Sequence, residues 1–207
     1  MAEASNRDRP STERRLLTCS ATLLATIGVA GLGVALMRSL WPNWNLLPAR
    51  RREFEFGDLE PGQFRQFEFE NLPVVVWRRT PEMLAAIHEA APQLADEGSR
   101  HSVQPVAAQN AWRSMNAEYL VVELLCTHLG CAVTAFDRQT TFAETYNKGE
   151  AGFVCPCHGA RYDAAGRVFK NQPAPKNLVV PLHRYVGKTR VELLHPDDPD
   201  ALSTQKN

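Results

Sequence analysis

Two short segments rich in cysteine and histidine constrain this chain more than any other part of it. The first reads Cys-Thr-His-Leu-Gly-Cys over residues 126–131, and the second reads Cys-Pro-Cys-His-Gly over residues 155–159. Each segment holds a cysteine and a histidine close together, and one further cysteine. Two thiolates and two imidazoles are enough to complete a four-ligand metal site. We therefore expect both segments to be loops that the fold brings together around one metal centre.

Two kinds of centre accept two cysteines and two histidines. One is a tetrahedral structural zinc ion. The other is a [2Fe–2S] cluster with two cysteines on one iron and two histidines on the other. Zinc fingers usually pair cysteine with cysteine and histidine with histidine, whereas each segment here supplies one of each. The mixed pairing favours the binuclear cluster, and zinc is the alternative. The candidate ligands are Cys126, His128, Cys155 and His158.

Two cysteines, Cys131 and Cys157, remain after the ligands are assigned. They are expected to occupy equivalent places in two loops that have to be adjacent. Buried free thiols are common in proteins, so an unpaired state is one interpretation. A disulfide between the two residues is the other, and it requires an oxidising compartment. The location of the chain therefore decides between them.

The N-terminal part of the chain contains a candidate membrane span. Residues 16–37 carry no charged side chain. At 1.5 Å per residue they would extend over roughly 33 Å, enough to cross a bilayer core. The flanking arginines are Arg7, Arg9, Arg14 and Arg15 before the span and Arg38 after it. Basic residues favour the inner side, so we predict a cytoplasmic segment 1–15 and a bacterial periplasmic head, where disulfides persist.

The residues at the start of the span bear on how the chain is exported. Residues 14–17 read Arg-Arg-Leu-Leu, which resembles a twin-arginine signal, although Glu13 stands where that motif prefers Ser or Thr. An ordinary signal-anchor is the alternative. Cys19 lies inside the apolar run and is interpreted as a small lipid-facing or helix-packing residue.

The remaining chain is interpreted as a tether, one domain and a tail. Residues 38–52 are expected to form a flexible tether of at most about 50 Å when fully extended. Trp41 and Trp44 in this segment suit a membrane interface. Residues 53–196 are expected to form the periplasmic domain, and 197–207 a polar tail. The formal net charge is +0 and no basic patch is present, so nucleic acid is not an expected partner.

The domain carries a pattern of short strands. Apolar and polar residues alternate, and turn signals such as Glu60-Pro61-Gly62 separate the segments, which indicates a mostly β, antiparallel fold. Thr80 and Pro81 predict the start of a helix that runs to about Ala90. Residues 142–152 form an insertion between the ligand loops. The expected strands lie at 53–56, 66–70, 74–77, 118–125, 167–169, 178–186 and 189–194.

Together these features resemble the Rieske iron–sulfur subunit of bacterial cytochrome bc complexes, the quinol–cytochrome c oxidoreductases. The resemblance covers the span, the tether and both Cys/His loops. It also covers Val-Trp-Arg-Arg-Thr-Pro at 76–81, Gly-Arg-Val-Phe at 166–169 and Pro-Ala-Pro at 173–175. It implies an antiparallel β-sandwich head with the Rieske fold, a cluster-binding subdomain at about residues 124–175 and one [2Fe–2S] cluster.

The resemblance assigns roles to the four ligand candidates. Cys126 and Cys155 would bind the inner iron, and His128 and His158 would bind the outer, exposed iron. Both histidines would act in the reaction, and His158 is the better candidate for the hydrogen bond to quinol.

The resemblance also assigns roles around the ligands. Cys131 and Cys157 would form the disulfide, and Leu129 would shield the cluster at a docking surface. Tyr162 would lie beside the ligands, and Pro173 would belong to a proline loop that covers the cluster.

One residue departs from the family pattern. Ala160 stands where the family commonly has a serine whose hydroxyl donates a hydrogen bond to a bridging sulfide. Such donors stabilise the reduced cluster and raise its potential. We predict a lower potential than in serine-bearing relatives, unless a water or a backbone amide compensates.

The resemblance implies a function. The chain would accept one electron and a proton from quinol at the outer face of the membrane and pass the electron to a c-type cytochrome. Its partners would be a cytochrome b subunit, a c-type cytochrome subunit and inner-membrane lipid in a dimeric complex, with a head that swings on its tether. The alternative is the Rieske subunit of another periplasmic oxidoreductase such as arsenite oxidase. The anchor, tether and proline loop favour the bc complex.

Overall fold

The computed structural model describes residues 11–40 and 51–201. Most of the expected cytoplasmic segment, most of the expected tether and the end of the expected tail lie outside these residues. The chain divides into two compact units, residues 1–47 and 48–207.

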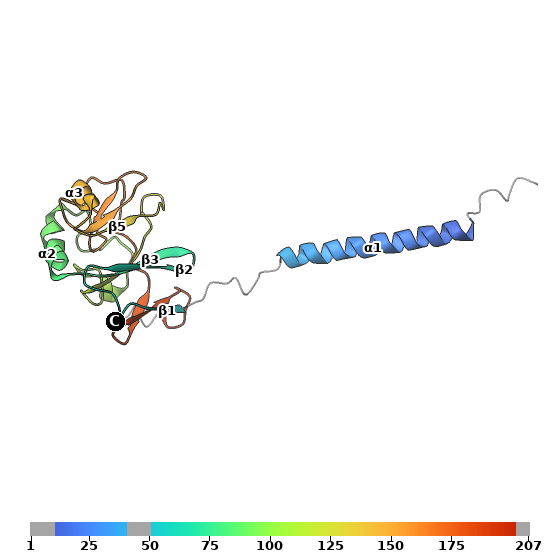
Figure 1. The fold of residues 1–207 in the computed structure, drawn as a ribbon, viewed down its shortest axis with the longest axis horizontal. Coiled ribbons are helices and arrows are strands. Elements are labelled where there is room, and N and C mark those ends of the chain that lie inside the picture. Colours follow the sequence, from blue (N-terminus) through green and yellow to red (C-terminus); the bar gives the residue numbers. More distant parts are fainter. Residues whose placement is uncertain (1–10, 41–50, 202–207) are drawn as a thin grey trace, which may run out of the picture. The chain divides into compact units, whose positions relative to one another are not determined.

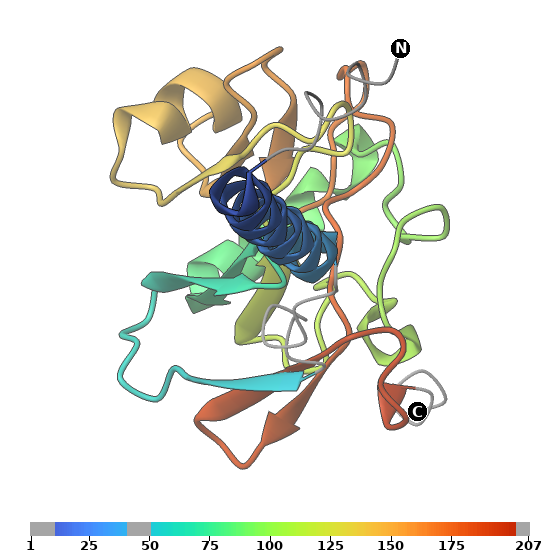
Figure 2. The ribbon, with the colours of Figure 1, turned by 90° about the vertical axis from the view of Figure 1, so that its right-hand side faces the viewer.

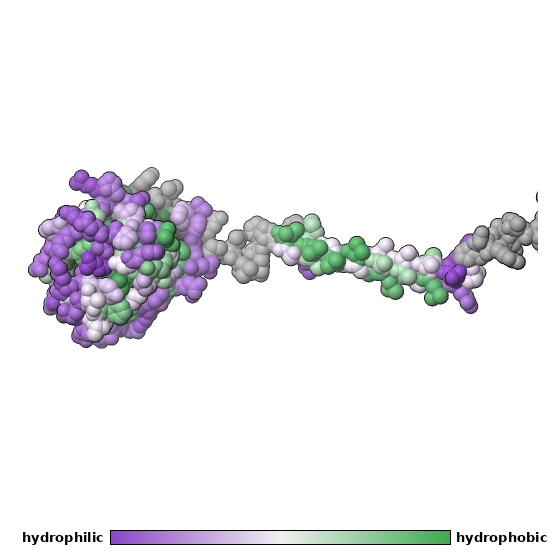
Figure 3. Space-filling model, turned by 90° about the horizontal axis from the view of Figure 1, so that it is seen from above, coloured by the Kyte–Doolittle hydropathy of each residue, from purple (hydrophilic) through white to green (hydrophobic). Residues whose placement is uncertain are grey.

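The first unit contains one long helix, α1 (Thr12–Leu40), which includes the whole expected span 16–37. None of its residues is buried. Figure 3 shows mainly apolar side chains along its middle and hydrophilic ones at its N-terminal end. By length and composition α1 can cross a membrane.

The second unit, here called the head (residues 51–201), is built from antiparallel sheets of three strands each. The order β1-β9-β8 joins β1 (Arg51–Glu55), β9 (Arg190–Leu194) and β8 (His183–Val186). The order β2-β3-β4 joins β2 (Phe64–Phe69), β3 (Leu72–Arg78) and β4 (Tyr119–Glu123). The order β5-β6-β7 joins β5 (Thr134–Phe136), β6 (Gly152–Val154) and β7 (Arg161–Asp163). The prediction of a mostly β, antiparallel fold is confirmed.

Strand β3 is buried on both of its faces. Val74 and Val76 pack in one apolar cluster with residues of β1 such as Phe54. Val75 and Trp77 pack in a second cluster, which also contains the ligand candidates' cysteines. Because both faces are covered, the strand appears in the sequence as an unbroken apolar run. Figures 1 and 2 show the β2-β3 hairpin between β1 and the part of the head that contains β5 and α3.

Helix α2 (Pro81–Ala90) begins and ends where the sequence predicted. The Thr80 hydroxyl accepts a hydrogen bond from the Met83 N–H at 3.3 Å, which is an ordinary N-cap. Met83 and Ile87 are buried on one face of the helix. A short 3₁₀ turn, η2 (Ala91–Gln93), follows.

Three predicted strands differ from the structure. β1 begins at Arg51 rather than Glu53, because it pairs with β9 from Arg51 onward. Residues 167–169 form isolated bridges rather than a strand. Of the expected strand 178–186 only β8 is present, since Pro181 lacks the N–H that a ladder needs and Val180 donates to Val103 instead.

Some elements were not predicted. Helix α3 (Thr141–Asn147) occupies the insertion between the ligand loops, and η3 (Val106–Ala108) lies in the long connection before β4. The strands β5, β6 and β7 were also missed. They are three residues long each, too short for an alternating pattern.

Candidate metal centre

Short antiparallel strands deliver both Cys/His segments to one end of the head. The first segment follows β4 and leads into β5, and the second joins β6 to β7. β6 pairs with β5 on one side and with β7 on the other. The segments before β5 and after β6 therefore leave the same end of this small sheet. We call residues 126–131 and 155–160 the tip loops.

The two tip loops have the same backbone turn. The Gly130 N–H donates to the Cys126 carbonyl, and the Gly159 N–H donates to the Cys155 carbonyl, both at 2.9 Å. Both glycines have positive φ, +77° and +70°, a conformation that side-chain-bearing residues rarely adopt. The repeated turn explains why Gly follows the Cys/His pair in each segment.

A second pair of hydrogen bonds closes each turn. The Cys126 N–H donates to the Cys131 carbonyl, and the Cys155 N–H donates to the Ala160 carbonyl, both at 2.8 Å. Cys131 therefore aligns with Ala160 and not with Cys157, so the expectation that the two spare cysteines occupy equivalent places is wrong. They nevertheless form a disulfide, with Cα atoms 6.6 Å apart. The predicted disulfide is confirmed.

The four ligand candidates divide into a buried pair and an outer pair. Cys126 and Cys155 are only 3% and 1% exposed and are not disulfide-bonded. His128 is half-buried and His158 is exposed. The two imidazole ring centres lie 5.0 Å apart. Thiols inside and imidazoles outside fit a cluster whose two irons have different ligands, one inner and one outer.

The arrangement fits a single zinc ion less well. A tetrahedral zinc site brings its ligand atoms to within about 4 Å of one another. Among the described residues, three such atoms meet within 4.8 Å only at Cys131, Cys155 and Cys157. Two of these three are consumed by the disulfide. The four candidate ligands therefore do not converge on one ion.

Tyr162 links the tip loops to the head's interior. It is fully buried, and its hydroxyl lies 3.3 Å from the Cys126 sulfur. Burial raises the pKa of the Tyr162 phenol, which therefore keeps its proton at neutral pH and can donate to that sulfur. Thr127 lies 3.5 Å from the same hydroxyl and donates to the Lys176 carbonyl at 2.6 Å. No local pattern around Thr127 predicts this role.

The residues that were predicted to surround the ligands differ in how far they are exposed to solvent. Ala160 is fully buried, so its methyl group takes a place that no solvent reaches. Leu129 is 72% exposed. Pro173 is exposed and Ala174 beside it is buried in the larger apolar cluster. The Thr127–Lys176 hydrogen bond ties the first tip loop to the segment that follows the prolines.

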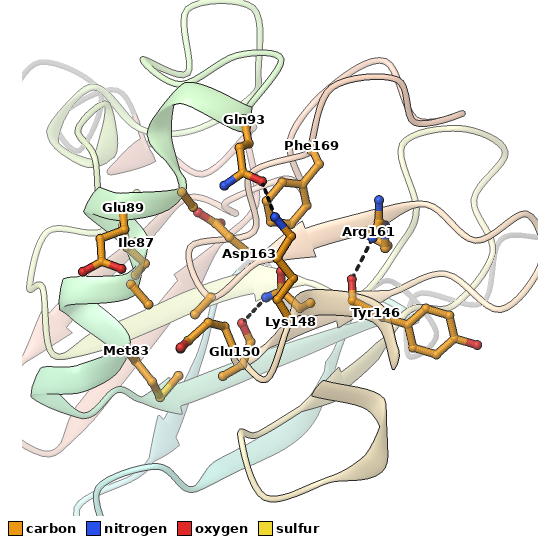
Figure 4. Close-up of a pocket in the computed structure, with 15 residues that line it drawn as sticks. Met83, Ile87, Glu89, Gln93, Tyr146, Lys148, Glu150, Arg161, Asp163 and Phe169 are labelled. Atoms are coloured by element: carbon orange, nitrogen blue, oxygen red, sulfur yellow. Dashed lines mark hydrogen bonds between the residues drawn. The ribbon is translucent and has the colours of Figure 1, made fainter. Parts of the chain in front are cut away.

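A hollow of about 300 Å³ elsewhere in the head contains none of the four ligand candidates. Figure 4 shows Met83 and Ile87 of α2 on one side of it, and Lys148 and Arg161 on the other. The Lys148 ammonium reaches across to the Gln93 side chain at 3.4 Å. Because none of the four ligand candidates lines this hollow, the hollow is not part of the metal centre.

Comparison with known proteins identifies the family. The sequence model described as Rieske [2Fe–2S] domain matches residues 52–186. The chain belongs to the Rieske [2Fe–2S] family. Membership implies one [2Fe–2S] cluster, and the disposition of the four ligand candidates fits a Rieske centre.

Relatives of this Rieske protein share most of its length. It is 38% identical over 179 residues to the "Ubiquinol-cytochrome c reductase iron-sulfur subunit" of Allochromatium vinosum, with 86% of each chain covered. It is 29% identical over 192 residues to the protein of the same name from Blastochloris viridis, covering 92% of this chain and 97% of that one. A solved chain of a "Hyperthermophilic respiratory Complex III" matches at 20% identity and a TM-score of 0.43, covering 84% of this chain and 98% of that one.

Proposed function

We propose that this chain is the iron–sulfur subunit of a quinol–cytochrome c oxidoreductase, anchored in the membrane by α1. The observation that carries the proposal is the disulfide-joined pair of Cys/His loops in a chain that also has an apolar N-terminal helix. The relative from Allochromatium vinosum bears this name and matches over 86% of both chains.

Four residues hold the cluster in this proposal. Cys126 and Cys155 bind the inner iron, and His128 and His158 bind the outer one. Burial of the thiols and exposure of His158 support this division. The bound cluster supplies a one-electron acceptor. The disulfide keeps the two tip loops together, so the ligands do not depend on the metal alone for their positions.

The histidines couple the electron to a proton. His158 is the more exposed imidazole and is our candidate for the hydrogen bond to quinol, with His128 beside it. With a cluster bound, the metal's charge would make the N–H of the ring nitrogen that does not bind iron more acidic, and in its deprotonated form that nitrogen would accept the quinol proton. Added negative charge makes the same nitrogen hold its proton more tightly. One quinol electron and one quinol proton therefore move together.

The surface around His158 suits a docked partner. Leu129 is a large apolar side chain left 72% exposed at the first tip loop. Against a cytochrome b subunit it would exclude water from the quinol site. The electron then passes to a c-type cytochrome, and the second quinol electron goes to a b-type haem of the partner. We place the complex, as a dimer, in the bacterial inner membrane.

The domain plan follows from this function. The proposed segments are a cytoplasmic N-terminus (1–15), the anchor (16–37), a tether, the periplasmic domain (to 196, with the cluster-binding part at about 124–175) and a tail (197–207). Because α1 extends to Leu40 and β1 begins at Arg51, the tether is taken as 41–50 in place of the expected 38–52, and the domain as beginning at Arg51 in place of residue 53. Within about ten residues of the anchor, four arginines precede it (Arg7, Arg9, Arg14 and Arg15) and one follows it (Arg38), which supports a cytoplasmic N-terminus. A head outside the cytoplasm is consistent with a lasting disulfide.

Electron paramagnetic resonance of the reduced, purified protein tests the proposal. We expect the low average g-value of an iron centre with histidine ligands, and its loss in His158→Ala. Purification from native membranes should recover b-type and c-type haem with the chain. Bound zinc and no iron signal would contradict the cluster. Recovery of molybdopterin instead of haem would indicate an arsenite-oxidase type of complex.

A further inference from the structure

Three arginine side chains are buried in the head, which is unusual for so strongly hydrated a charge. Arg79, Arg113 and Arg167 are 2%, 0% and 1% exposed. Burial lowers the pKa of Arg79 to about 9 and that of Arg113 to about 10. Both values lie above neutral pH, so both guanidinium groups stay charged. Each buried charge costs free energy unless it is compensated.

The three arginines surround one short turn, residues 163–167, which follows the second tip loop through β7. Arg79 donates to the Ala164 carbonyl at 3.4 Å, and Arg113 donates to the Gly166 carbonyl at 3.3 Å. Arg167 donates to the Asp163 carboxylate at 2.8 Å. Figure 4 shows Asp163 opposite Ile87 of α2, whose carbonyl accepts another hydrogen bond from Arg167.

Only one of the three charges is directly neutralised. Arg167 forms an ion pair with Asp163 at 2.7 Å. Arg79 and Arg113 form no ion pair with any residue in the described ranges 11–40 and 51–201, and their hydrogen bonds end on neutral oxygens. For Arg79 these include the Trp112 carbonyl and the Ser114 hydroxyl. The turn therefore lies in a region of net positive charge.

This positive region shares its apolar surroundings with the cluster ligands. Cys126, Cys155, Tyr162 and Ala164 belong to one buried cluster. Tyr162 contacts the Cys126 sulfur and precedes the turn in sequence. Water screens charges poorly inside such a core. Positive charge there stabilises a group that gains an electron, and so favours reduction.

We propose that the buried charges of Arg79 and Arg113 raise the reduction potential of the cluster held at Cys126 and Cys155, and so offset the donor missing at Ala160. The proposal rests on the proposed function, because it requires the cluster. It gives the two unpaired arginines a role beyond holding the turn.

Paired substitutions separate charge from geometry. Arg79→Lys keeps the charge and loses part of the hydrogen-bond fork, whereas Arg79→Gln keeps a donor and loses the charge. The same pair is made at Arg113. We expect each Gln variant to lower the equilibrium constant for reduction about threefold to tenfold, and each Lys variant to change it less than twofold. A tenfold change corresponds to about 59 mV for one electron.

A substitution that removes a negative charge near the arginines provides an independent test of the proposal. Asp163 and Asp96 are the carboxylates whose charges act on Arg113, and Asp96, which is not paired with Arg167, accepts from the Ser102 hydroxyl at 2.7 Å. Asp96→Asn removes a negative charge and should favour reduction, which simple loosening of the fold would not do. Arg184→Gln is the control, because Arg184 lies on β8 and is 42% exposed. It should leave the potential unchanged.

The measurement is a redox titration of the purified full-length chain, followed by visible circular dichroism, with cluster content and thermal unfolding recorded for each variant. Equal shifts for Lys and Gln, or no shift for Gln in loaded protein, overturn the proposal. A rise in potential for Asp96→Asn supports it, and no change or a fall opposes it. If Arg79→Gln fails to fold, the Arg113 pair and Asp96→Asn decide. Absence of a cluster in the unmodified chain would instead refute the proposed function.

Discussion

At the scale of single residues, the two tip loops differ most clearly in the side chain of the residue whose carbonyl closes each turn. The Cys126 N–H meets the carbonyl of Cys131, and the Cys155 N–H meets the carbonyl of Ala160. The same backbone position thus holds half of the disulfide in one loop and a buried methyl group in the other. A side-chain hydroxyl at residue 160 would lie inside the core beside the second pair of ligands.

We predict that Ala160→Ser raises the cluster's midpoint potential. The new hydroxyl can donate a hydrogen bond to sulfur of the reduced cluster, and a bond to a charged acceptor is worth on the order of 1–3 kcal/mol. This corresponds to roughly 40–130 mV for one electron. Ala143→Ser is the matched control, because Ala143 is also fully buried but lies in α3, outside the tip loops and the 163–167 turn. A redox titration in which Ala160→Ser leaves the potential unchanged would contradict the prediction.

His183 gives a pH dependence at the same scale. The ring is fully buried, its Nε2 atom has no hydrogen-bond partner among the described residues, and its Nδ1 atom lies 2.8 Å from the Pro181 carbonyl. Burial lowers the pKa of His183 from 6.5 to about 4. The folded state therefore binds this proton less readily than the unfolded state does. Its contribution to stability is complete above pH 6.5 and is lost as the pH falls towards 4.

We predict that the free energy of unfolding of the wild-type head falls by about 2 kcal/mol between pH 7 and pH 5 through His183 alone. Urea titrations of wild type and His183→Phe at both pH values measure it, and the free energy of unfolding of wild type should fall by this amount relative to that of His183→Phe. His88→Gln serves as the control, because His88 is exposed on α2. A parallel pH dependence in wild type and His183→Phe would rule this explanation out.

At the scale of elements, the sequence predicted those parts whose signal is local. Thr80 and Pro81 mark the start of α2, and the N-cap hydrogen bond follows from the residue types. The apolar run of β3 is long enough to recognise. The strands β5, β6 and β7 depend on pairing with one another, and no three-residue segment carries that information. Propensity alone therefore could not place them.

The candidate site follows the same division. The four ligand types and their spacing were readable because the metal chemistry requires them. The disulfide followed from the resemblance. Contacts between distant segments were not readable, because Thr127 meets Lys176 and Arg79 meets Ala164 only after folding. Long-range contacts of neutral atoms leave no pattern in one sequence.

The tip loops also give a prediction about their turns. Gly159 has a φ of +70°, and a Cβ atom added there would meet nothing within 4 Å. Gly159→Ala therefore costs only backbone strain, about 1–2 kcal/mol of stability. Gly98→Ala is the control, because Gly98 lacks positive φ and its added Cβ would make ordinary contacts with Arg100. Urea unfolding should show the loss at Gly159 and a change below about 0.5 kcal/mol at Gly98. Equal losses of stability in Gly159→Ala and Gly98→Ala would show that a side chain at residue 159 does not strain the turn.

At the scale of the whole molecule, the length of chain between the anchor and the head limits any movement. Helix α1 ends at Leu40 and β1 begins at Arg51. The intervening residues can span at most about 35 Å, less than the 15-residue tether that the sequence suggested. The Arg51 guanidinium is held by Asp198 at 3.0 Å and Asp200 at 3.1 Å, so the head's side of the link is fixed at Arg51.

We predict that turnover depends on the flexibility of this link and not on its sequence. Replacing residues 42–49 by a Gly/Ser segment of equal length should leave quinol–cytochrome c activity in membranes within about twofold of wild type. A polyproline segment of the same length is stiff and extended, and it should lower activity several-fold. Because both variants leave the head unaltered, the cluster's potential should be the same in both. Equal turnover with the stiff and the flexible link would mean that the head does not need to move between its partners. A shifted potential would mean instead that the link contacts the cluster's surroundings.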